Sequence, residues 1–100
     1  MQNVMGGYEN DCTLARLAMN RYMLMSPSIQ QMRSFTWMKN NLPKDGSVFL
    51  QDVTSMYTSL CLMGPNAKMV LSKLTDADLD LPNFTVHALD VSCAPDVLAE

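Results

Sequence analysis

Polar and apolar side chains alternate most clearly near the start of the chain, from residue 12 to residue 18. One face carries Cys12, Leu14 and Arg16, and the other carries Thr13, Ala15 and Leu17. This period of two is typical of a β-strand. We expect residues 19–21 to form a hairpin turn, because Asn20 can adopt a left-handed backbone conformation. The apolar run at residues 22–25 then predicts the second strand of a hairpin.

A helical period replaces the alternation between residues 29 and 42. Its apolar side chains recur near one face, at Ile29, Met32, Phe35, Met38 and Leu42. Ser26 can cap the start of this helix, and Pro27 suits the first helical position, where a missing N–H costs nothing. Pro43 ends the helix, and residues 44–47 have the composition of a turn.

The second half of the chain repeats this order. Alternation returns at residues 48–53, and residues 57–63 are rich in strand-forming side chains, so two further strands are expected. Residues 64–66 (Gly-Pro-Asn) then open a second helix. Its apolar side chains follow the i, i+3, i+4, i+7 spacing at Ala67, Val70, Leu71 and Leu74. Residues 84–91 predict one more strand, whereas residues 92–100 carry no clear signal and are expected to fray.

These segments give the order strand, strand, helix, strand, strand, helix and a final strand, written ββαββα(β). Hairpins followed by helices are typical of the α+β class. The pattern therefore predicts one antiparallel sheet with two helices packed on one face.

Composition narrows the range of functions. Apolar residues make up 48% and charged residues 17% of the 100-residue chain, which argues for a folded domain or a piece of one. The net charge of −3 argues against nucleic-acid binding. No apolar run approaches the roughly 20 residues that span a membrane, so no membrane contact is expected. The first residues resemble no targeting signal, which predicts either a cytosolic chain or a longer protein with a leader.

Ten methionines predict a loosely specified core. A sheet cut from a larger domain also leaves an apolar face or an unpaired edge strand exposed. We therefore expect the isolated chain to self-associate.

The residues most often used for metal or nucleophilic chemistry are few and scattered. Cys12, Cys61 and Cys93 lack the spacing of metal ligands, and we interpret them as buried or half-buried thiols. His87 lies in an apolar stretch and is interpreted as structural. The acidic cluster at residues 76–80 lacks the spacing of a calcium loop and is interpreted as solvated.

The residues best suited to bind a ligand are a glycine pair and an acid that follows it closely in the sequence. Gly6 and Gly7 allow a tight turn or the close approach of a ligand. Asp11 follows Gly7 by four residues and precedes the first strand. Its carboxylate can accept a hydrogen bond or a proton from a bound molecule, or it can cap the turn, and both interpretations stay open.

Two stretches, residues 6–17 (GGYENDCTLARL) and residues 57–74 (YTSLCLMGPNAKMVLSKL), resemble motifs of the folate-binding aminomethyltransferase family. They occur in the family's order and at about its separation. The resemblance implies that residues 1–82 are a fragment of the family's folate-binding domain and that residues 83–100 are an unmatched tail.

The resemblance also implies a site. The family's acid beside the pteridine end of folate falls on Asp11, so Asp11 is the candidate catalytic residue and Gly7 and Asp11 are the candidate contacts for tetrahydrofolate. Glycine-cleavage members commonly have two adjacent acids where this chain has Asn10-Asp11, and often an aromatic residue at the position of Ala15. The chain has no flavin fingerprint, so FAD is expected only in a longer parent protein.

Residues 6–12, together with residues 26–31 and 37–45, most resemble the family branch that regulates pyruvate dehydrogenase phosphatase. This implies a non-catalytic protein of the mitochondrial matrix that acts by contact with the phosphatase catalytic subunit. The alternative is a folate-binding part of an aminomethyltransferase or of a dimethylglycine or sarcosine dehydrogenase, and a small domain that binds nothing is a third. Whether the chain belongs to an enzyme is left open by the sequence.

Overall fold

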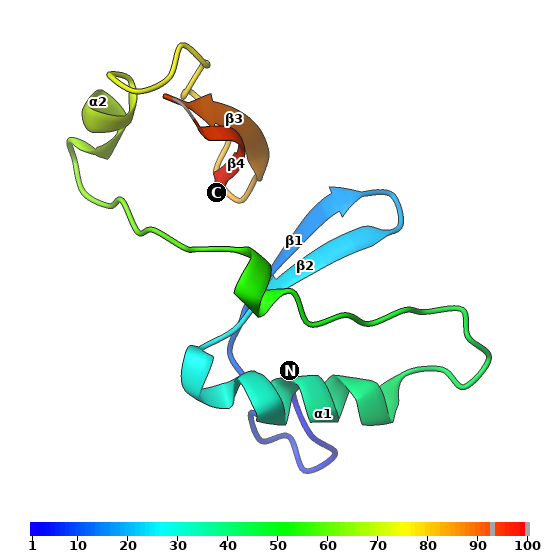
Figure 1. The fold of residues 1–100 in the computed structure, drawn as a ribbon. Coiled ribbons are helices and arrows are strands. Elements are labelled where there is room, and N and C mark those ends of the chain that lie inside the picture. Colours follow the sequence, from blue (N-terminus) through cyan, green and yellow to red (C-terminus); the bar gives the residue numbers. More distant parts are fainter. Residues whose placement is uncertain (93, 100) are drawn as a thin grey trace. The chain divides into compact units, whose positions relative to one another are not determined.

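The computed structural model describes residues 1–92 and 94–99. The fold is α+β, as predicted, with two α-helices and two antiparallel strand pairs among these residues (Figure 1). The chain divides into two compact units, Met1–Thr58 and Ser59–Glu100. Each unit has one helix and one strand pair, so the single predicted sheet is replaced by two separate hairpins.

The first unit contains the predicted N-terminal hairpin. Strand β1 (Thr13–Ala18) pairs with β2 (Arg21–Met25), and Leu14 lies opposite Leu24. The register shifts between Arg16 and Ala18, which marks an irregularity next to the turn. The hairpin prediction is confirmed.

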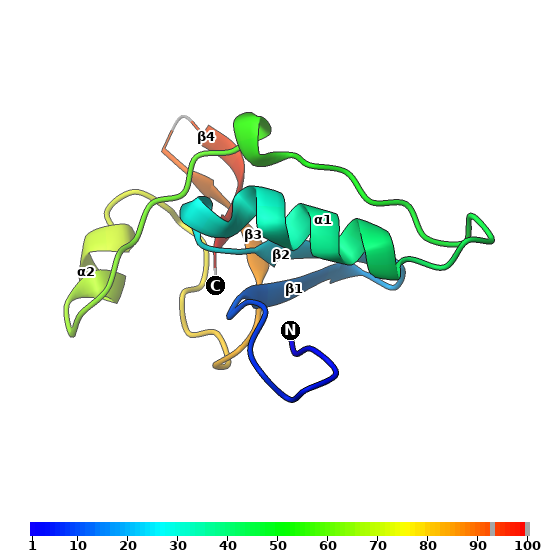
Figure 2. The same cartoon turned by 90° about the horizontal axis from the view of Figure 1, so that it is seen from below.

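Helix α1 (Gln31–Asn41) follows a 3-10 turn, η1 (Ser28–Gln30). The two views of Figures 1 and 2 show α1 lying across one face of the β1–β2 hairpin. The helix prediction is confirmed, but the capping prediction is wrong, because no side chain caps either segment. Pro27 instead precedes η1 with an extended backbone. Leu42, the residue before Pro43, is also extended, as steric conflict with a following proline favours.

The predicted apolar stripe is covered only in part: Phe35, Met38 and Leu42 are half-buried, but its first two residues are not. Ile29 is 92% exposed and Met32 is 73% exposed, whereas the buried residue of the helix is Ser34. The apolar side of the helix therefore has no cover at its beginning within the described residues.

The strands predicted at residues 48–53 and 57–63 are wrong. These residues form no strand, and the regular structure between them is a 3-10 turn, η2 (Thr54–Met56). A strand needs a partner for its backbone hydrogen bonds, and no described segment pairs with either stretch. The Asp52 carboxylate instead accepts hydrogen bonds from the backbone N–H and hydroxyl of Thr54, at 2.9 and 2.7 Å.

The second unit begins with α2 (Ala67–Leu71), which ends three residues before the predicted apolar pattern does. Strand β3 (His87–Val91) confirms the strand predicted near residues 84–91. The expectation of a frayed end is wrong, because β4 (Ala94–Ala99) pairs with β3 and places Leu89 opposite Val97. The tail lacked a signal because Pro and Asp interrupt its apolar alternation.

Hydrogen bonds to two backbone carbonyls tie this hairpin to the segment after α2. The Ser92 N–H donates to the Leu74 carbonyl at 2.6 Å. The Thr75 hydroxyl donates to the Asp90 carbonyl, also at 2.6 Å. Residues 83–99 therefore share a unit with α2, and the sequence-based division at residue 82 stays a prediction.

Burial is slight in both units. Ala15 and Leu89 are the buried apolar residues of the described chain, one in each unit. Large apolar side chains are exposed in both, among them Phe49 at 86% and Leu60 at 91%. Among the described residues, no helix has the length and apolar character needed to cross a membrane.

Candidate functional site

The glycine pair lies in a tight loop that closes on Asn3. Asn3 Oδ1 accepts hydrogen bonds from the backbone N–H groups of Met5 and Gly7, at 3.0 and 2.9 Å. Gly6 has a φ of +79°, a backbone conformation that favours glycine. A Cβ atom on Gly7 would lie 3.3 Å from Asn3 Nδ2, so this position favours a residue without a side chain. The loop itself therefore explains both glycines.

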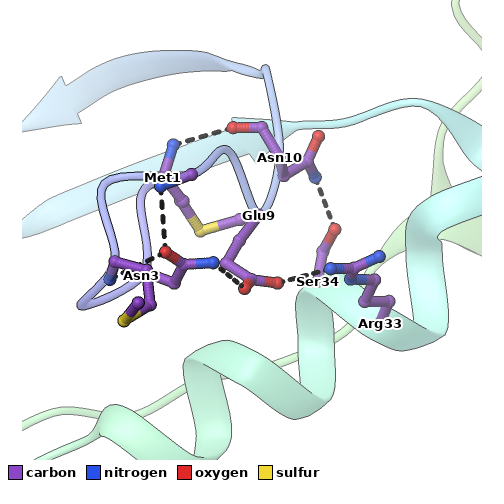
Figure 3. Close-up of polar contacts among 8 residues, drawn as sticks. Met1, Asn3, Glu9, Asn10, Arg33 and Ser34 are labelled. Carbon is purple, nitrogen blue, oxygen red and sulfur yellow. Dashed lines mark hydrogen bonds and ion pairs between the residues drawn. The ribbon is translucent and has the colours of Figure 1, made fainter.

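Glu9 connects this loop to α1. Arg33 donates to Glu9 Oε2 at 2.7 Å, and Asn3 Nδ2 donates to Glu9 Oε1 at 3.0 Å (Figure 3). The hydrogen bond from Arg33, and after it the one from Asn3, lowers the pKa of Glu9 below its ordinary value of 4.5. The side chain of Arg33 is 63% exposed and that of Glu9 is 16% exposed, so this ion pair is partly open to solvent.

Beneath it lies a buried polar contact. Asn10 is 2% exposed and Ser34 is 3% exposed, and Asn10 Nδ2 donates to Ser34 Oγ (Figure 3). The Met1 nitrogen donates to the Asn10 carbonyl at 2.7 Å. Two buried side-chain oxygens, Asn10 Oδ1 in this contact and Gln30 Oε1, have no partner among the described residues. An unpaired buried polar atom costs about 1–3 kcal/mol, so this arrangement is not the one that burial alone favours.

Asp11 is exposed beside the buried Asn10. The first unit has four carboxylates, and three of them accept hydrogen bonds from described residues: Glu9, Asp45 and Asp52. The described residues donate none to Asp11. The structure thus places Asp11 two residues before β1 with its side chain exposed to solvent, and no hydrogen bond joins it to Gly7.

Sequence reasoning identified Gly7 and Asp11 but missed the residues that surround them. The missed residues are Asn3, Glu9, Asn10, Arg33 and Ser34. A local signal existed for one of them, because Asn10 replaces an acid at a position that the family resemblance marks. Their contacts span 24 residues, a distance that periodicity does not predict.

The other candidate groups do not form a site. Cys12 is half-buried, as predicted, but Cys61 is exposed, and Cys93 lies outside the described residues. The ring of His87 contacts the Thr85 hydroxyl at 3.1 Å. In the described part of the chain no three metal-ligating side chains gather.

Within the acidic cluster at residues 76–80, Asp80 pairs with Lys68 at 2.9 Å, and Asp78 accepts from the Asp80 N–H. This ion pair, through the Lys68 hydrogen bond first, lowers the pKa of Asp80. These contacts explain the cluster as part of a loop that folds toward α2.

Comparison with known proteins identifies the family of this chain. The family described as the GCVT N-terminal domain matches residues 1–99. The chain belongs to this family.

The relatives fall into two groups. The chain is 45% identical over 84 residues to the mitochondrial pyruvate dehydrogenase phosphatase regulatory subunit of Mus musculus, covering 84% of this chain and 10% of that protein. It is 35% identical over 89 residues to the aminomethyltransferase of Listeria monocytogenes serotype 4a (strain HCC23), covering 89% of this chain and 24% of the enzyme. The aminomethyltransferase of Geobacillus kaustophilus is 36% identical over 74 residues, which are 74% of this chain and 20% of that enzyme.

The chain thus spans about a tenth of the mouse protein and about a quarter of the Listeria enzyme. No solved structure matches it. These matches establish the family of the chain. The activities of the full-length relatives do not follow from matches of this extent.

Proposed function

We propose that the chain is part of a regulatory protein that acts by contact with a phosphatase catalytic subunit in the mitochondrial matrix. The observation that carries this proposal is the 45% identity over 84 residues to a regulatory subunit of pyruvate dehydrogenase phosphatase, against 35% over 89 residues to the Listeria aminomethyltransferase.

The exposed apolar surface supports a role in protein contact. Tyr8, Leu14 and Tyr22 of the first unit are 76%, 61% and 55% exposed. Large exposed apolar groups mark surfaces that other protein covers.

The test measures binding of the 100-residue chain to the catalytic subunit of pyruvate dehydrogenase phosphatase. The Listeria aminomethyltransferase is the matched negative control, because it shares the fold family and not the proposed partner. Saturable binding of the chain at micromolar concentration, with none by the enzyme, supports the proposal. Equal binding by both, or by neither, contradicts it.

A second candidate function is binding of tetrahydrofolate, and the free carboxylate of Asp11 favours it. An exposed acceptor without an internal donor suits an N–H group at one end of a pteridine. The fit is partial, because Ala15 is only 3% exposed and offers no ring on which a ligand can stack. The described residues thus supply one anchoring acceptor and not a complete folate pocket.

Calorimetry with tetrahydrofolate tests this candidate by comparing the parent chain with Asp11→Asn. The matched control is Asp76→Asn, which removes the same charge from an exposed acid that has no described hydrogen-bond partner. A loss of affinity in Asp11→Asn alone supports a folate-binding role for Asp11. Null heats, or equal heats in all three proteins, would rule it out.

A further inference from the structure

The buried contact between Asn10 and Ser34 is the feature that the family resemblance does not explain. Both residues are at least 97% buried, and their side chains join the segment before β1 to the middle of α1. A pair of apolar side chains would fill this space without leaving Asn10 Oδ1 unpaired. Packing alone therefore does not explain why a polar pair occupies this buried position.

The residue that follows Asn10, Asp11, indicates a second role for this pair. Asn10 is buried and Asp11 is exposed, so the backbone turns one side chain inward and the next outward at this point. Fixing the inward side chain on a helix restricts the rotation of the peptide that carries the outward one. The Asn10 carbonyl is held as well, by the Met1 nitrogen.

We infer that Asn10 and Ser34 are positioning residues for Asp11. Their buried hydrogen bond fixes the backbone at residues 10–11 and thereby sets the direction in which the Asp11 side chain leaves the backbone toward solvent. This role rests on the second candidate function, in which Asp11 binds a ligand, but the ordering of Asp11 can be measured without any ligand.

The neighbouring Glu9–Arg33 pair provides a contrast within the same structure. It joins the same two segments, yet the side chain of Arg33 is 63% exposed and that of Glu9 is 16% exposed, so solvent reaches the pair from the Arg33 side. A surface pair of this kind holds its partners less firmly than a buried hydrogen bond does. Arg33→Gln is therefore the matched control for a substitution at Ser34.

The first measurement is the backbone order parameter of Asp11 by nitrogen-15 relaxation, in four proteins without ligand. In the parent chain, the order parameter of Asp11 should equal that of α1, about 0.85. In Ser34→Ala the order parameter of Asp11 should fall to about 0.6. Ser34→Thr, which retains the hydroxyl, should restore the parent value, and Arg33→Gln should leave it unchanged. An unchanged value in Ser34→Ala, or no recovery in Ser34→Thr, overturns the inference.

The parent chain alone keeps the inference falsifiable if Ser34→Ala does not fold. Asp11 should then be more ordered than the exposed residues Val4 and Met5 of the adjacent loop. Equal mobility of Asp11 and those residues overturns the inference without any variant.

The second measurement separates this inference from the folate proposal. Ser34→Ala should weaken tetrahydrofolate binding by about fivefold or more in the parent chain, and by nothing further in the Asp11→Asn background. Equal weakening in both backgrounds would show an effect that does not act through Asp11, and overturns the inference. If Asp11→Asn binds as the parent does, the folate proposal fails, and the relaxation data alone decide whether Asp11 is positioned.

Discussion

The two units of this chain hold a hairpin beside a helix, but they fasten the two elements by different contacts. In the first unit, side chains make the connection, through Asn10 with Ser34 and Glu9 with Arg33, across 24 residues of sequence. In the second, backbone carbonyls accept the connecting hydrogen bonds, those of Leu74 and Asp90.

This difference determines what a single substitution can do. A hydrogen bond between two side chains is lost when either residue is substituted. A function that relies on this bond therefore depends on the identity of those two residues. In the second unit the Ser92–Leu74 bond joins two backbone groups and survives most substitutions, whereas the Thr75–Asp90 bond is lost when the Thr75 hydroxyl is removed. One of its two connecting bonds thus tolerates most side-chain changes, and this unit depends more on its packing. Leu89, its one buried apolar residue among those described, is the centre of that packing.

The largest effect is expected from Leu89→Ala. Truncating a buried leucine costs about 2–5 kcal/mol, which is a large part of the stability of a small unit. Amide exchange should show loss of protection at residues 87–91 and 94–99, while β1 and β2 keep theirs. If protection in both hairpins falls together, the units do not unfold separately and the comparison fails.

A smaller and separate effect is expected from Ser34→Ala. This change leaves the buried Asn10 amide without its partner, at a cost of about 1–3 kcal/mol. Urea unfolding should show a lower midpoint for the first unit, with Ser34→Thr close to the parent. A midpoint that does not move would mean that the contact adds nothing to the stability of this unit.

Acid should weaken the first unit through Glu9. The folded pKa of Glu9 is below its ordinary value of 4.5, so the unfolded chain takes up the proton first as the pH falls. The stabilisation is thus present above pH 4.5 and is lost as the pH drops through the folded pKa. Urea unfolding between about pH 6 and about pH 3 should show this loss, and Glu9→Gln should reduce it. Identical pH profiles for the two proteins would contradict the assignment.

The smallest effect is expected from Lys68→Gln in the second unit. Lys68 and Asp80 have side chains that are 66% and 92% exposed, so solvent and salt screen their attraction. The melting temperature should stay within the error of the parent at physiological ionic strength. A clear drop would show that surface side chains fasten this unit too.

The sequence predicted those elements whose stabilising contacts are local. The β1–β2 hairpin and α1 follow from alternation, helical spacing and the proline at residue 43. The stretches at residues 48–53 and 57–63 have strand-like patterns, but a strand also needs a partner, and single-sequence patterns do not say whether one is within reach. The β4 strand was missed for the converse reason, because pairing with β3 outweighs its weak pattern.

The same division applies to the candidate site. Asp11 and Gly7 were found from residue type, spacing and resemblance. The Asn10–Ser34 contact was not, because it depends on where α1 packs against the segment before β1. The exposed state of Ile29 and Met32 was missed too, since an apolar stripe indicates which face seeks cover and not whether cover is present.

Sedimentation velocity of the chain alone and mixed with the catalytic subunit of pyruvate dehydrogenase phosphatase tests the central proposal of protein contact most directly. The account predicts that the chain alone self-associates as its concentration rises, since its apolar side chains are uncovered, and that the mixture contains a faster complex of both proteins. A monomer at all concentrations that sediments independently of the catalytic subunit would contradict it.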